Sequence, residues 1–320
     1  MLSVALCTYN GERYIKEQLE SLMHQTMMPD ELVISDDGSK DATLRIVREF
    51  AMQAPFPVRI YEQPSLGTTA NFSEAIAQCC GDYIALCDQD DVWLPDKLLS
   101  SMEMIKSQEE RWSPDCPLLV HGDLCVVNER LKVLQPSMMA AQGICDEPVM
   151  KDAFAVLLVQ NYVTGCTVLF NKALKVLACP FPSHIVMHDW WLALMAAAAG
   201  QIGFLAQSHI LYRQHGDNQV GAKKFFSWEN MVKVFGVEKI RQQMKTVLQQ
   251  DMSLKERMGE SVCPAAVLTE RYLSAIKERS AWCCTSSLGI HKQKYIRDIF
   301  FRFFLFIYRR DFADLLEGRE

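Results

Sequence analysis

Short β-type runs alternate with segments of helical periodicity along the first part of the chain, and this alternation constrains the fold more than any other feature. Between the runs, apolar residues recur at helical spacing, as in Ile15, Leu19 and Leu22. Strands separated by helices form βαβ units, which place the strands in a largely parallel sheet. The four runs expected to form these strands are residues 2–7, 32–35, 58–62 and 83–87.

The rest of the chain has two parts with different patterns. Beyond Ala222 the periodicity is helical almost throughout. The sequence therefore predicts an α/β domain over residues 1–221, with a mixed, mainly parallel sheet flanked by helices, and a helical C-terminal region over residues 222–320. Further strands that complete the sheet are expected at residues 118–121, 167–170, 202–205 and 210–213.

A polar cluster follows three of the expected strands directly. The clusters are Thr8-Tyr9-Asn10-Gly11, Asp36-Asp37-Gly38-Ser39 and Asp88-Gln89-Asp90-Asp91. In open α/β sheets, ligands bind beyond the carboxyl ends of the strands. We therefore expect the three clusters to contribute to one site.

The third cluster packs three carboxylates into four positions. Such carboxylates repel one another unless a cation or a hydrogen-bond donor lies between them. Mg²⁺ or Mn²⁺ prefers carboxylate oxygens together with phosphate and water, so Asp90 in this cluster is a candidate metal ligand. Helix capping is the alternative for Asp91, because Pro95 and an amphipathic helix follow it.

The second cluster matches a pyrimidine base. One of its carboxylates, Asp36 or Asp37, can accept the imide N3–H of uracil or thymine, with Thr8 and Tyr9 contacting the same base. An ordinary turn is the alternative, since Asp-Gly and Ser are common turn residues.

A fourth motif, His188-Asp189-Trp190-Trp191, opens an apolar, alanine-rich helix. Asp189 is either a general base for an acceptor hydroxyl or a helix N-terminal residue stabilised by the helix dipole. Trp190 and Trp191, together with Trp93, can form an apolar platform for sugar C–H faces. His215 ends a strand, and a neutral imidazole near a dicarboxylate suits a metal.

Together these motifs resemble the family 2 inverting glycosyltransferases of GT-A fold, and most closely their rhamnosyltransferase-like members. The likeness covers roughly residues 1–221 and rests on the order and spacing of residues 4–11, 35–39, 67–72, 87–93, 188–191 and 212–215. No Gln-x-x-Arg-Trp motif is present, which disfavours a processive synthase. Pro64 stands where many relatives carry Asn.

The resemblance implies a role for each motif. Asp90 and His215 would hold the divalent cation, Mg²⁺ or Mn²⁺, and Asp189 would be the catalytic base. Residues 1–115 would form the nucleotide-sugar-binding half and residues 116–221 the acceptor-binding half. Donor contacts, to a dTDP- or UDP-sugar, are assigned to Thr8, Tyr9, Asn10, Glu12, Asp36, Asp37, Asn71, Asp88 and Gln89, with Asp88 on the ribose side.

Composition limits the partners and the compartment. A net charge of −6 argues against general binding to nucleic acid. The 12 cysteines include no CxxC pair, which favours a reducing cytoplasm over a disulfide framework. No run reaches the ~20 apolar residues of a spanning helix. Aromatic and basic residues around 292–310 predict a helix that contacts the inner face of the cytoplasmic membrane. The alternatives are a core helix or a contact with a second copy of the chain.

The predicted reaction is the inverting transfer of rhamnose or a related hexose to a saccharide or lipid-linked acceptor in bacterial surface polysaccharide synthesis. Two alternatives remain open. A sugar-nucleotide pyrophosphorylase would need a glycine-rich, basic phosphate loop, and Asn10-Gly11-Glu12-Arg13 is not one. A membrane-bound scaffold with a decayed site would bind no nucleotide tightly.

Overall fold

The computed structural model describes residues 1–144, 153–216, 228–259, 263–278, 280, 285–292 and 295–319. The chain forms two compact units. The first comprises Met1–Ala141, Val163–Phe181 and Gly200–Gly221, and the second comprises Gln142–Tyr162, Pro182–Ala199 and Ala222–Glu320.

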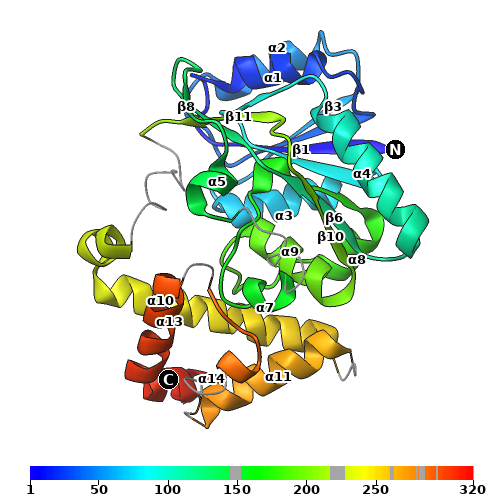
Figure 1. Ribbon diagram of the computed structural model, residues 1–320. Coiled ribbons are helices and arrows are strands. Elements are labelled where there is room, and N and C mark those ends of the chain that lie inside the picture. The colour runs from blue at the N-terminus through cyan, green and yellow to red at the C-terminus, as the bar shows by residue number, and fades with distance from the viewer. Residues whose placement is uncertain are drawn as a thin grey trace. The chain divides into compact units, whose positions relative to one another are not determined.

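A seven-stranded sheet is the centre of the first unit (Figure 1). Its order is β10-β6-β9-β4-β1-β2-β3, and every neighbouring pair is parallel except those of β9 with β4 and β6. Strands β1, β2 and β4 are buried throughout, as expected of continuous apolar runs covered on both faces. The strands are β1 (Leu2–Thr8), β2 (Glu31–Asp36), β3 (Val58–Glu62), β4 (Tyr83–Cys87), β6 (Leu118–Gly122), β9 (Leu169–Asn171) and β10 (Gln201–Leu205).

Helices fill the connections between these strands, which confirms the predicted α/β class. Helices α1 and α2 pack on each other, α3 packs on β1 and β2, and α4 packs on β6, β9 and β10. The helices of this unit are α1 (Ile15–Met23), α2 (Thr43–Ala51), α3 (Thr68–Gln78), α4 (Lys97–Trp112), α5 (Met138–Gln142) and α8 (Lys172–Ala178).

A second, four-stranded sheet differs from the prediction of one sheet. Its order is β5-β11-β7-β8, formed by β5 (Val92–Trp93), β7 (Cys125–Asn128), β8 (Val133–Gln135) and β11 (Ile210–Gln214). Strand β11 was expected in the main sheet, but it pairs with β5, which directly follows the acidic cluster. The strand expected at 167–170 is shorter because Gly165–Thr167 forms a 3₁₀ turn.

The second unit is helical in its described part. Helix α9 (His188–Ala199) packs on α7 (Ala153–Leu157) and α11 (Pro264–Lys277). Helices α10 (Trp228–Met258), α11 and α14 (Arg309–Leu316) pack on one another, and α13 (Tyr295–Ile307) packs on α14. The proposed boundary at residue 221 lies outside the described residues and remains a prediction.

Candidate functional site

Three strand ends bring the predicted clusters to one edge of the main sheet. Strands β1 and β2 are parallel with Thr8 opposite Asp36, and β1 and β4 are parallel with Leu6 opposite Cys87. The residues that follow these positions therefore leave the sheet side by side. Three loops converge, as the sequence predicted: residues 8–13, 36–43 and 88–91.

The carboxylate of Asp36 organises its own loop. It is fully buried and accepts hydrogen bonds from the hydroxyl of Thr8 (2.6 Å), the N–H groups of Gly38 (3.1 Å) and Ser39 (2.8 Å), and the Ser39 hydroxyl (2.6 Å). Four donors occupy the acceptor capacity of one carboxylate. Asp36 thus shapes the loop, and its carboxylate has no acceptor site left for a base.

Asp37 has acceptor capacity remaining. Its two carboxylate oxygens accept one hydrogen bond each, from the N–H groups of Leu66 (2.6 Å) and Gly67 (2.9 Å). Since each carboxylate oxygen can accept about two, Asp37 is the member of the pair that can still meet an imide N–H. Close by in the fold, Asn71 is buried and donates to the carbonyl of Ser35 (2.9 Å).

Gln89 fastens the first loop to the acidic loop. Its amide accepts from the Tyr9 N–H (2.8 Å) and donates to the Tyr9 carbonyl (2.9 Å), while the Tyr9 side chain stays half exposed. A Cβ on Gly11 would lie 2.2 Å from the Gln89 amide oxygen, so a larger residue there would displace the Gln89 amide from its present position. Asn10 and Glu12 accept from the N–H groups of Lys40 and Ala42 in the second loop (both 2.8 Å).

Asp90 and His215 lie together, although 125 positions separate them. The Asp90 carboxylate contacts Nε2 of His215 at 2.8 Å, and both side chains are largely buried. The Tyr14 ring packs on the imidazole, with ring centroids 4.7 Å apart. A carboxylate and an imidazole in contact are a ligand pair of the kind that binds divalent cations.

Arg213 supports this pair through the backbone of Asp90, a role that was not predicted from the sequence. Its guanidinium is 1% exposed and donates to the Asp90 carbonyl (2.9 Å), the Glu129 carbonyl (2.7 Å) and the Glu17 carboxylate (2.6 Å). The Arg213 N–H also donates to Asp91 (3.1 Å). These partners lie 84 to 196 positions away, so no local pattern could reveal them.

Asp91 is not a helix cap. It is fully buried immediately before β5, and α4 begins only at Lys97. Asp88, Asp91 and Cys166 each offer one atom that could bind a metal, and these three atoms lie within 4.8 Å of one another. Burial, then the charges of Asp90 and Asp88, raise the pKa of Asp91 well above its usual range. The Asp91 Oδ2 atom has no hydrogen-bond partner in the described structure, and such a group is satisfied by a nearby cation. The residues present therefore fit a divalent ion.

The three tryptophans do not form the expected platform. Trp93 is 2% exposed and Trp191 is fully buried, so both are core residues. Trp190 is 6% exposed, and its indole donates to the Leu157 carbonyl at 2.6 Å. Large rings contribute most to stability when they are buried, and here that packing removes their faces from solvent.

Asp189 lies in the first turn of α9 in the second unit. Its carboxylate is 8% exposed and accepts a hydrogen bond from Asn161 (3.1 Å) and one from the Trp190 N–H (2.6 Å). The helix dipole favours a carboxylate at this position. Asn161 orients the carboxylate, and the sequence carried no signal for it.

Comparison with known proteins places these loops in a family. The model of glycosyl transferase family 2 matches residues 3–111, which include all three loops. The dTDP-rhamnosyl transferase RfbG of Shigella flexneri is 30% identical over 236 residues, covering 69% of this chain and 75% of that protein. The chain belongs to glycosyl transferase family 2.

Other family relatives are longer than the matched region. An uncharacterized protein of Mycobacterium tuberculosis is 29% identical over 217 residues, and the chain covers 59% of its length.

No helix of the family 2 chain, within the residues that the structure describes, has the length and apolarity to cross a membrane.

Solved structures place the family 2 chain in the GT-A fold. S. aureus TarS in complex with UDP-GlcNAc aligns with a TM-score of 0.56 at 18% identity, covering 99% of this chain and 89% of that one. The mannosyltransferase PcManGT from Pyrobaculum calidifontis, in complex with GDP-Man and Mn²⁺, aligns at 0.53 and 15%, covering 99% and 84%. The predicted family and fold are confirmed.

Proposed function

We propose that the chain transfers a hexose, rhamnose or a related sugar, from a dTDP- or UDP-sugar to a saccharide or lipid-linked acceptor during bacterial surface polysaccharide synthesis. The observation that carries this is the convergence of three strand-end loops on the Asp90–His215 pair, 2.8 Å apart. Support for the sugar comes from the name of the RfbG relative.

Asp90 and His215 are the proposed cation ligands, with Asp88 beside them on the ribose side. Mg²⁺ or Mn²⁺, when bound, supplies positive charge to the donor diphosphate. The chain's own part is to hold the two ligands at one point, through Arg213 under the Asp90 carbonyl and Tyr14 against the imidazole.

For the base of the donor, Asp37 is the proposed acceptor of the pyrimidine imide N–H. Asp36 is proposed to act through Thr8 and Ser39, which it holds by hydrogen bonds of 2.6 Å each. The half-exposed ring of Tyr9 is proposed to stack on the base. Asn10, Glu12, Asn71 and Gln89 are proposed to position these loops.

Asp189 remains the proposed general base. A carboxylate that accepts the acceptor proton as the hydroxyl attacks gives inversion in one displacement, with no covalent enzyme intermediate. The hydrogen bond from Asn161 supports this role by fixing the orientation of the carboxylate.

Calorimetry with a panel of nucleotides, with and without Mn²⁺, tests the proposal. A pyrimidine diphosphate should bind tightly only with the metal. Tight, metal-dependent binding of a sugar 1-phosphate together with a nucleoside triphosphate would favour a pyrophosphorylase instead. Absence of binding by every nucleotide would favour the scaffold.

Contact with the inner face of the cytoplasmic membrane is also proposed, through helix α13. An apolar stripe of Ile299, Phe303, Phe306 and Ile307 is exposed, each side chain at 42% to 51%. Phe301, Phe304 and Leu305 of the same helix are buried. Arg309 and Arg310 follow the stripe, as suits an anionic lipid surface.

A further inference from the structure

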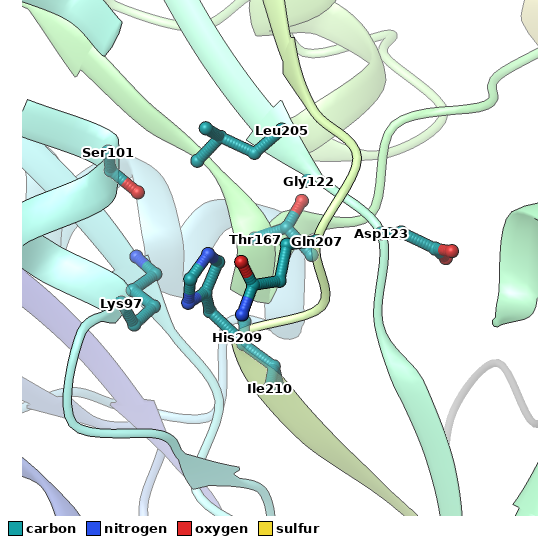
Figure 2. A pocket seen from close by; sticks show the side chains of 9 residues that line it. All are labelled: Lys97, Ser101, Gly122, Asp123, Thr167, Leu205, Gln207, His209 and Ile210. Carbon is teal, nitrogen blue, oxygen red and sulfur yellow. The ribbon is translucent and has the colours of Figure 1, made fainter. Parts of the chain in front are cut away.

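A small cavity lies in the first unit, between the start of α4 and the segment that leads into β11. Figure 2 shows the side chains that line it, among them Lys97, Ser101, Thr167, Gln207 and His209. None of these residues has a role in the proposed transfer reaction. The cavity offers about 10 Å³ to the centre of a water molecule, which is room for one water or one ion of similar size.

Lys97 brings a positive charge into this cavity. The side chain is 2% exposed, and its ammonium lies 3.9 Å from the centroid of the Trp93 ring. Within the residues that the structure describes, Nζ of Lys97 has no hydrogen-bond partner. A buried ammonium without a counter-charge is strongly unfavourable, and one aromatic face offsets only part of that free energy.

The carboxylate that lines the cavity does not neutralise Lys97. Asp123 points away from the ammonium in Figure 2, and its Oδ1 accepts hydrogen bonds from the N–H groups of Leu124 (2.8 Å) and Met139 (3.0 Å). The remaining polar lining includes the Ser101 hydroxyl, the Gln207 amide and the His209 ring, each of which can donate or accept a hydrogen bond. Together with the unneutralised ammonium, their donor groups can coordinate an anion.

We propose that this cavity binds a small monovalent anion of the halide class, with the Lys97 ammonium as its counter-charge and Ser101 and His209 as flanking donors. The small volume excludes phosphate and sulfate. Lys97 is the first residue of α4, so the positive end of the helix dipole favours the same charge. The bound anion would join α4, which follows the acidic loop, to the chain entering β11, which ends one residue before His215.

Thermal unfolding in sodium chloride and in sodium gluconate, at matched ionic strength, tests the site. Gluconate is too large to enter. Chloride should raise the wild-type melting temperature by roughly 2–4 °C for each tenfold increase above its dissociation constant. Lys97→Met should abolish this response. Lys16→Met, which removes a surface lysine of the same unit at 76% exposure, should keep it.

Bromide gives a direct reading that does not depend on any variant folding. Crystals of the whole wild-type chain soaked in sodium bromide should show an anomalous peak beside the Lys97 ammonium. Equal chloride responses in wild type and Lys97→Met, or a cavity that holds only water in bromide, would overturn the proposal. Both measurements are independent of glycosyl transfer, so they stand or fall separately from the proposed reaction.

Discussion

Asp90 is the residue whose charge matters most to the proposed cation site, and its carboxylate contacts Nε2 of His215 at 2.8 Å. Asp90→Asn keeps the shape but removes the charge, so most metal-dependent turnover should be lost while the melting temperature stays within a few degrees. Turnover across a Mn²⁺ titration measures this. Asp96→Asn, at an exposed position in the same segment, is the control and should retain activity. Near-wild-type activity of Asp90→Asn would exclude Asp90 as a metal ligand.

Asp189 allows a sharper separation between catalysis and structure. A positioned base contributes about 10²–10⁴ in rate, so Asp189→Asn should lower turnover by that factor and leave nucleotide affinity nearly unchanged. If Asp189 only stabilises the first turn of α9, Asn replaces it with little loss, because Asn caps about as well as Asp. Transfer to an authentic acceptor, measured beside nucleotide affinity, decides between them, and an undiminished rate would rule out the base.

The sequence predicted which motifs form the site, but not what each side chain within them contacts. The convergence of the acidic motifs could be predicted because each motif directly follows a strand, and that pattern is visible in a short stretch of sequence. The difference in remaining acceptor capacity between Asp36 and Asp37 could not be predicted, because it depends on donors from Thr8 and from Leu66. The tryptophans were misassigned because a large ring has the same sequence signature in a core and on a sugar platform.

At the scale of elements, Arg213 of β11 connects that strand to the acidic loop through the Asp90 carbonyl and to α1 through the Glu17 carboxylate. Arg213→Met leaves the Asp90 and Glu129 carbonyls without their donor, and each unpaired buried group costs about 1–3 kcal/mol. The free energy of unfolding should therefore fall by at least about 2 kcal/mol, with weaker Mn²⁺ binding. Urea unfolding and metal titration measure the two effects.

The control for Arg213 is Arg13→Met. Arg13 also pairs with Glu129, but its side chain is 63% exposed, so its loss should change stability by about 1 kcal/mol or less. Equal losses in the two variants would mean that Arg213 supports the loop no better than a surface ion pair.

Helix α13 gives a second prediction at this scale. Phe303→Glu with Phe306→Glu places two charges on the exposed stripe and should release the chain from anionic vesicles in a flotation assay. The buried side of the helix is untouched, so folding should persist. Val176→Glu is the matched control, since Val176 is 71% exposed on α8 of the other unit. If flotation is unchanged and a dimer dissociates instead, the stripe is a contact between copies.

The positions of strands and helices were easier to predict than the pairing of the strands. Apolar periodicity located β1 to β4 and the helices between them. It could do so because the spacing of apolar residues along an element shows which of its faces are buried. Which sheet β11 joins depends on its pairing with β7 and with β5, and β5 is a two-residue strand too short to have a pattern.

For the whole molecule, the stability of the fold should depend on pH through Lys97. Burial lowers the pKa of Lys97 from 10.5 to about 8. Between these values the unfolded chain holds a proton that the folded chain has released, so the free energy of unfolding should rise with pH, by up to ~1.4 kcal/mol per pH unit. Below pH 8 both states are protonated and this slope vanishes.

The difference between wild type and Lys97→Met isolates that slope, because every other titrating group is common to the two proteins. Urea unfolding from pH 7 to 10.5 in chloride-free buffer measures it. Chloride should flatten the wild-type curve, since an anion beside the ammonium keeps the proton bound. Parallel curves for the two proteins would contradict the lowered pKa.

The reciprocal pairing of Gln89 with the Tyr9 backbone has a consequence for the rate of donor capture. The first and third loops are fastened to each other by the protein alone, so their conformational entropy is lost during folding and not when the nucleotide arrives. Association should then be a single-phase process with a rate proportional to nucleotide concentration, without a slow rearrangement of these loops. Gln89→Ala would free both loops and open a gap beside Gly11, which should convert donor binding into two kinetic phases in a stopped-flow experiment.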